Sequence, residues 1–227
     1  MRAIVVYVSG KGELGDAMIL IGQYDSPFVR RVAVTLQLYK LSYEHRPWSA
    51  VGDADKIAEV NPLMRVPTLI TVEGEAVTDS STILQLLDHM AGFGAFLSRN
   101  WPQQGEVLRL AAFAAGAADK GVALLYEGAF HENATPFWHQ RLHRQVSETL
   151  ALLDRERAAR KTPWLFGERL SHADIIIGTM LCFLREALPG TFDLEGFKAL
   201  KKHGKACEAL PEFKNAYQPY ALGMPKD

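Results

Sequence analysis

Residues 18–36 have the sequence MILIGQYDSPFVRRVAVTL, and their hydrophobic pattern changes in the middle. The first apolar run ends at Gly22, and from Pro27 onward apolar residues return at helical spacing. This pattern predicts a buried strand, a tight turn and a helix. Proline is favoured at the first position of a helix, and serine is favoured as the cap that precedes it. We therefore expect Ser26 to cap the helix, close to the end of the strand.

A serine in this position has two possible roles. The unpaired N–H groups at the start of a helix and the positive end of the helix dipole both favour an anion. The hydroxyl of Ser26 could therefore help to hold a bound thiolate. The alternative is that Ser26 caps its helix and has no chemical role.

The composition is that of a folded globular protein. The chain has 227 residues, of which 48% are hydrophobic and 22% charged, enough for one or two domains with a sizeable core. The formal net charge of -1 gives no electrostatic reason to expect nucleic acid or a membrane as a partner. The apolar run 175–184 is about half the ~20 residues that a membrane span needs. We expect a cytoplasmic protein, with Cys182 and Cys207 as buried or free thiols and no metal site.

The first 17 residues contain a misleading glycine motif. Gly10, Gly12 and Gly15 match the G-x-G-x-x-G pattern of dinucleotide-binding turns. That motif has to open a helix, whereas here a second apolar strand follows at Met18, which disfavours a dinucleotide site. We interpret residues 1–17 as a leader or tag that is possibly not native, and Met18 as the natural start.

The rest of the chain divides into a mixed part and a helical part. Strands are predicted at 43–46, 66–72 and 76–78, with helices at 55–60 and 80–90, so that 18–90 has the order βαβαββα. A linker is predicted at 91–102, and 103–227 is expected to be all helical. Ser171 and Asp174 are spaced as a capping box before an apolar helix that should form the core of the second domain.

Four short segments resemble motifs of the glutathione transferase family. Ser26-Pro27-Phe28 resembles the active-site turn of its serine-type, tau-like classes, and NPLMRVP at 61–67 resembles a segment with a cis proline. The other two segments are the pairs Asp79-Ser80 and SHAD at 171–174. The resemblance implies a thioredoxin-like domain at 18–90 and an all-helical domain at 103–227.

The resemblance also implies a role for each site residue. Ser26 would be catalytic, activating the thiol of glutathione, and Val66 beside cis Pro67 would pair through its backbone with the cysteinyl part of glutathione. The remaining glutathione contacts would come from Asp79, Ser80 and Arg65. Glutathione would be a co-substrate, and no metal is implied.

The implied function is a detoxification enzyme that conjugates glutathione to a small hydrophobic electrophile and acts as a homodimer. Two alternatives remain: a non-catalytic interaction or chaperone-like protein on the same fold, and a glutathione-dependent, zeta-like isomerase. The isomerase is weakened because Asp25 and Pro27 stand where such enzymes carry serine and cysteine. His139 and His143 have metal-ligand spacing, but we interpret them as a surface or packed pair. Tyr126 and Phe130 could line the electrophile pocket or belong to the core.

Overall fold

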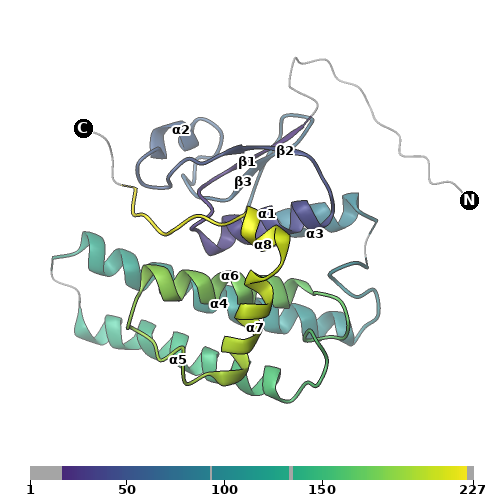
Figure 1. Cartoon of the computed structure of the whole chain (residues 1–227). Helices are drawn as coiled ribbons and strands as arrows, with labels where there is room; N and C mark the ends of the chain where they lie inside the picture. The colour runs from purple at the N-terminus through teal and green to yellow at the C-terminus, as the bar shows by residue number, and fades with distance from the viewer. Residues whose placement is uncertain (1–16, 93, 133–134, 224–227) are drawn as a thin grey trace, which may run out of the picture.

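The computed structural model describes residues 17–92, 94–132 and 135–223, and the proposed leader lies outside these residues except for Ala17. A four-stranded sheet with helices forms the first half, and an all-helical region forms the second (Figure 1). The predicted fold class is confirmed. The elements of the first half are β1 (Met18–Ile21), α1 (Pro27–Leu38), β2 (Tyr43–Arg46), α2 (Ala54–Ala58), β3 (Thr68–Ile70), β4 (Ala76–Thr78) and α3 (Ser80–Met90).

The sheet has the strand order β2-β1-β3-β4. β1 pairs in parallel with β2 and antiparallel with β3, and Leu20 in β1 lies opposite Leu69 in β3. α1 and α3 lie between this sheet and the helical region (Figure 1). The strand predicted at 66–72 is shorter than expected, because Val66 and Pro67 precede β3 in a turn. This shortening leaves Val66 outside the ladder of the sheet.

The helical region is built around one buried helix. Nearly every residue of α6 (His172–Ala187) is buried, and the helix packs against α4, α1 and α7. Its prediction as the core helix is confirmed. At Gly178 a Cβ atom would come within 2.8 Å of the Cβ of Cys207, so the small residue allows α7 to approach closely. The other helices are α4 (Gln103–Phe130), α5 (Pro136–Ala158), α7 (Lys198–Glu208) and α8 (Pro211–Asn215).

The start of α6 is fixed by the predicted capping box. The Ser171 hydroxyl accepts a hydrogen bond from the backbone N–H of Asp174, and the Asp174 carboxylate accepts one from the backbone N–H of Ser171. The same fully buried carboxylate also accepts the backbone N–H of Leu165 at 2.9 Å. Asp174 therefore joins the loop before α6 to the core helix, and its role is structural.

A second buried polar contact joins α3 in the first half of the chain to α6 in the second half. The Nε2 atom of His172, at the start of α6, lies 2.9 Å from both carboxylate oxygens of Asp88 in α3. Tyr39, at the end of α1, donates its hydroxyl to the same carboxylate. Asp88 and His172 are both buried, so this is a buried polar contact between α3 and α6.

None of the helices in the described ranges is long and apolar enough to cross a bilayer.

Candidate functional site

Ser26 occupies the N-cap of α1, as predicted. Pro27 is the first residue of the helix, and the Ser26 hydroxyl accepts the backbone N–H of Val29 over 3.4 Å. That bond is longer than the usual 2.7–3.2 Å, so the hydroxyl is only weakly held and can turn toward a ligand. The turn before it requires Gly22, which has φ +130 and where a Cβ would lie 2.5 Å from Val29 and 2.8 Å from Val66. The strand end, Ser26 and Val66 are thereby brought close together.

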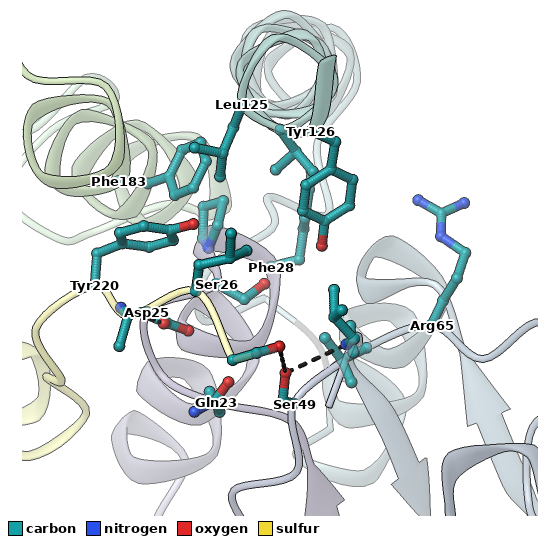
Figure 2. Close-up of a pocket in the computed structure, with 18 of the residues that line it drawn as sticks. Gln23, Asp25, Ser26, Phe28, Ser49, Arg65, Leu125, Tyr126, Phe183 and Tyr220 are labelled. Atoms are coloured by element: carbon teal, nitrogen blue, oxygen red, sulfur yellow. Dashed lines mark hydrogen bonds between the residues drawn. The ribbon is translucent and has the colours of Figure 1, made fainter. Parts of the chain in front are cut away.

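Ser26 lines a pocket between the sheet side of the molecule and the helical region, which we call the Ser26 pocket (Figure 2). Its floor comes from the turn before α1, one wall from α4 and α6, and the other from the C-terminal tail. The lining residues are Gln23, Asp25, Ser26, Pro27, Phe28, Ser49, Ala50, Val51, Met64, Arg65, Val66, Asp119, Val122, Leu125, Tyr126, Phe183, Tyr220, Ala221, Leu222 and Gly223.

A second depression, the Ser80 groove, adjoins this pocket. The two depressions share Phe28, Arg65, Val66 and Asp119, so they lie side by side, and we refer to them together as the trough. The groove is more polar than the pocket, because it contains the start of α3. Its lining residues are Phe28, Leu63, Arg65, Val66, Pro67, Thr78, Asp79, Ser80, Ser81, Ala115, Gly116 and Asp119. All the site residues expected from the sequence line one or both of these depressions.

The turn before β3 lines the trough with Val66 and Pro67. The Val66–Pro67 peptide bond is cis. The buried amide of Asn61 donates to the carbonyl of Arg65 and to the hydroxyl of Thr68, which fixes the turn from behind. Within the described part of the chain, no hydrogen bond uses the backbone N–H or C=O of Val66. Both groups are therefore unused within the described chain and could pair with a ligand lying alongside as an added strand.

Asp79 and Ser80 lie at the start of α3. Asp79 adopts φ 65, and its Oδ1 atom accepts the backbone N–H groups of Ser81 and Thr82 at 2.8 and 3.2 Å. Ser80 is buried, with 4% of its surface exposed. The carboxylate of Asp79 thus caps α3 in addition to any contact with a ligand.

Arg31 adds a buried positive charge near Asp79, which no sequence pattern indicated. The side chain is 3% exposed, and its Nε and Nη1 atoms have no hydrogen-bond partner among the described residues. Burial lowers the pKa of Arg31 to about 10, while the charge of Asp79 acts in the opposite direction. Arg31 therefore remains charged at neutral pH and favours negative charge at the Asp79 end of the groove.

Arg65 differs from the other expected site residues. It is exposed, and in Figure 2 its guanidinium extends away from Ser26. Its backbone carbonyl, by contrast, is held by Asn61 and Thr68. The residue borders both depressions.

The C-terminal tail, residues 216–223, closes one side of the Ser26 pocket, which no sequence pattern indicated. The backbone N–H of Ala221 donates to Asp25 at 3.1 Å, and the Ser49 hydroxyl donates to the carbonyl of Gly223 at 3.2 Å. Arg30 holds the start of the tail in place. Its guanidinium forms a bidentate ion pair with Glu208 and donates hydrogen bonds to the carbonyls of Phe213 and Ala216. These contacts bring Tyr220 beside the turn that carries Ser26.

Two tyrosines and the carboxylate of Asp25 are among the polar groups that line the pocket. Tyr126 and Tyr220 both line it, whereas Phe130 contacts the ring of Tyr126 and is not among the lining residues. Burial raises the pKa of Asp25, and burial together with the charge of Asp25 raises the pKa of Tyr220 to about 12. Burial also raises the pKa of Tyr126. Both tyrosines are therefore neutral hydrogen-bond donors at neutral pH.

The two histidines with metal-ligand spacing, His139 and His143, lie in different environments. The Nε2 atom of His143 lies 3.0 Å from the carbonyl of Thr191, and its ring stacks on Phe192, while His139 is exposed. Across the residues that the structure describes, no group of three or more His, Cys, Asp or Glu side chains is arranged to hold a metal ion. Cys182 and Cys207 are buried free thiols.

These features define a thioredoxin-like protein with a helical second half and a binding trough at the joint. The family model described as glutathione S-transferase, N-terminal domain, matches residues 20–94, and the one described as glutathione S-transferase, C-terminal domain, matches residues 136–203. The chain belongs to the glutathione transferase family.

Individual relatives agree with this assignment. The chain is 33% identical over 112 residues to the uncharacterized GST-like protein YibF of Escherichia coli (strain K12), a match that covers 49% of this chain and 55% of YibF. The chain thus spans about half the length of that relative. A glutathione S-transferase of Methylobacterium radiotolerans, solved in complex with glutathione sulfonate, has a TM-score of 0.85 at 26% identity and covers 93% of this chain and 99% of its own. One from Methylobacillus flagellatus, with glutathione bound, has a TM-score of 0.80 at 27% identity over 92% and 100% of the two chains.

Proposed function

We propose that this protein is a serine-type glutathione transferase, which binds glutathione along the Ser80 groove and conjugates it to an apolar electrophile in the Ser26 pocket. One observation carries the proposal. Ser26, the N-cap of α1, lines a pocket that adjoins a groove containing Asp79 and Ser80 and shares lining residues with it. A ligand that fills the groove would bring its thiol to the hydroxyl of Ser26. The two similar structures that hold glutathione or its sulfonate support this choice of ligand.

The chemistry asked of Ser26 is to stabilise the thiolate of glutathione. A free thiol with a pKa of about 8.5 is only a few per cent ionised at about pH 7. Lowering this pKa by ~2 units needs about 2.7 kcal/mol of stabilisation of the thiolate. A hydrogen bond from Ser26 to the thiolate is worth ~1.5–3 kcal/mol, and the N-terminus of α1 adds ~0.3–1 kcal/mol. Together these two contributions are large enough, and no general base is needed.

The proposed contacts of glutathione follow the trough. The backbone of Val66 would pair with the cysteinyl residue, and Ser80 and Asp79 would bind the γ-glutamyl carboxylate and amine. The buried charge of Arg31 favours the carboxylate at that end. Arg65 would add a contact from the open side. Glutathione is a co-substrate in this proposal, and no step requires a metal.

The wider proposal is a cytoplasmic detoxification enzyme that works as a homodimer. Exposed apolar side chains on α4, those of Leu108 and Phe113, offer a surface on which a second copy could pack. The electrophile is expected to be largely apolar, because Val122, Leu125 and Phe183 line the pocket above Ser26.

Replacing Ser80 by alanine is expected to weaken glutathione binding by about 10- to 100-fold, because a hydrogen bond to a carboxylate is worth ~1.5–3 kcal/mol. Isothermal titration calorimetry with glutathione measures this change. The matched control is Thr82→Ala, two residues further along α3, which is exposed and does not line the groove. It should bind as the wild type does.

Two results would argue against the proposal. If the wild type does not bind glutathione, the alternative of a non-catalytic interaction protein takes the place of the transferase. If it binds glutathione and isomerises a cis-diene acid without consuming glutathione, the isomerase is selected instead. Equal affinities for the wild type and Ser80→Ala would leave glutathione binding intact and remove Ser80 from the site.

A further inference from the structure

The carboxylate of Asp25 lies in the Ser26 pocket without a cation to compensate its charge. Its Oδ2 atom accepts the backbone N–H of Ala221 at 3.1 Å. Among the described residues, Asp25 forms no ion pair with a lysine, arginine or histidine. Burial raises the pKa of Asp25, and the charge of Glu186 acts in the same direction, whereas backbone N–H groups lower it. A positively charged ligand group would therefore be stabilised beside this carboxylate.

The other charged side chains of the pocket do not reverse this balance. Asp119 is a second carboxylate in the lining, and it is already paired with Lys120 at 3.0 Å. Among the described lining residues, the only lysine or arginine is Arg65, whose guanidinium extends away from Ser26 in Figure 2. An anionic electrophile would be repelled here, and an electrophile with a cationic group would be attracted.

Aromatic side chains line the same pocket as Asp25. Figure 2 shows Tyr126 and Phe183 on the helical side of the pocket and Asp25 on the side of the α1 turn. The face of an aromatic ring attracts a cation, and quaternary ammonium ligands are held in cages of such rings. Aromatic walls together with one uncompensated carboxylate are suited to an ammonium group on an apolar body.

We propose that the electrophile carries an ammonium group and that the carboxylate of Asp25 selects it. This inference rests on the proposed transferase function and specifies its substrate class. Asp25 and Ser26 are consecutive residues, so the ammonium group and the reacting carbon would be separated by a short spacer such as a benzene ring. The positive charge of the electrophile would also reduce the repulsion between Asp25 and the thiolate of glutathione.

The reaction is a substitution in which the ammonium group is not altered. The glutathione thiol releases its proton to solvent, and the thiolate sulfur forms a bond to the carbon that carries the leaving group. The bond to the leaving group breaks, and the leaving group, chloride in a benzyl chloride, departs with both bonding electrons. Asp25 would act by binding and orienting the electrophile, and no oxidant or reductant is needed.

The test compares two benzyl chlorides of the same shape on the wild type and on Asp25→Asn. One carries a trimethylammoniomethyl group at the para position, and the other carries a neopentyl group, in which a carbon replaces the charged nitrogen. Relative to the uncatalysed reaction of each compound, the wild type is expected to have a kcat/KM about 5- to 50-fold higher for the cationic one. Asp25→Asn should remove most of this preference. Its kcat/KM for the neutral compound should not fall, because asparagine keeps an oxygen for the N–H of Ala221.

The matched control is Asp55→Asn, which removes a carboxylate outside the site. Asp55 lies on α2, is exposed, and lines neither the Ser26 pocket nor the Ser80 groove. This variant should keep the preference for the cationic compound within about twofold, because salt screens distant exposed charges. An equal loss of preference in Asp55→Asn would assign the selection to the overall charge of the protein and overturn the inference.

A binding measurement provides a second readout that does not depend on turnover. In calorimetry, the wild type should bind the cationic S-benzylglutathione product several-fold more tightly than the neopentyl product, and Asp25→Asn should bind the two equally. Equal losses with both compounds in Asp25→Asn would mean that Asp25 only anchors the tail, and would overturn the inference. Equal kcat/KM values for the two compounds in the wild type would also overturn it, whereas failure to bind glutathione at all would overturn the proposed function itself.

Discussion

Ser26→Ala is expected to lower kcat/KM for benzyl chloride by about 10- to 100-fold at neutral pH, because the thiolate of bound glutathione loses a hydrogen bond worth ~1.5–3 kcal/mol. Glutathione affinity should change by less than about threefold, since Val66, Asp79 and Ser80 would still hold the tripeptide. Steady-state kinetics with calorimetry on the same samples measures both quantities.

A control for this prediction is needed because Ser26 also caps α1. Loss of a capping side chain costs about 1 kcal/mol of stability, so thermal unfolding of Ser26→Ala should be recorded beside its kinetics. Ser26→Thr keeps a hydroxyl at the cap and should recover part of the lost activity. Wild-type kcat/KM in Ser26→Ala would mean that Ser26 only caps its helix, the alternative that the sequence alone left open.

Asp174→Ala is expected to lower the free energy of unfolding by about 3–5 kcal/mol, the largest stability effect predicted for this chain. The carboxylate is fully buried and accepts hydrogen bonds from the backbone N–H groups of Leu165 and Ser171 and from the hydroxyl of Ser171. Its removal leaves these donors unpaired in the core, at ~1–3 kcal/mol each when they cannot find water. Urea unfolding followed by circular dichroism measures the change.

The matched control for Asp174 is Asp154→Ala. Asp154 is half-buried and accepts one backbone N–H, that of Leu200 at 2.9 Å. Its loss should cost about 1 kcal/mol. If the two variants were destabilised equally, the buried capping network at the start of α6 would not have the importance that its geometry indicates.

The parts of the fold that could be predicted are those with local signals. The strand before Gly22, the cap at Ser26 and the capping box of Ser171 and Asp174 each depend on residues within a few positions of one another. Hydrogen bonds across three or four residues leave a recognisable spacing in the sequence, and the structure contains these elements where they were expected. The candidate glutathione contacts came from motif resemblance and line one trough, but their roles stay proposals.

The parts that could not be predicted depend on contacts between distant residues. Ala221 binds Asp25 across 196 positions, and Arg30 binds Glu208 across 178. The tail has no periodic pattern, so nothing in its sequence predicted that it would cover the Ser26 pocket or that Tyr220 would line this pocket. Two neighbouring arginines on a helix would be expected to face solvent, yet Arg30 and Arg31 are both buried. Arg30 forms an ion pair with Glu208 in α7, and Arg31 lies near Asp79.

The thiol pKa of glutathione bound to the wild-type protein tests the central claim most directly. The absorbance of the thiolate at about 240 nm is followed as the pH is raised, with the protein in excess over glutathione. The predicted pKa is about 6.5, some two units below that of the free thiol, because Ser26 and the N-terminus of α1 stabilise the anion. The carboxylate of Asp25 in the same pocket opposes this shift, so the measurement also decides which influence is stronger. A bound thiol that still titrates near about 8.5 would contradict the account.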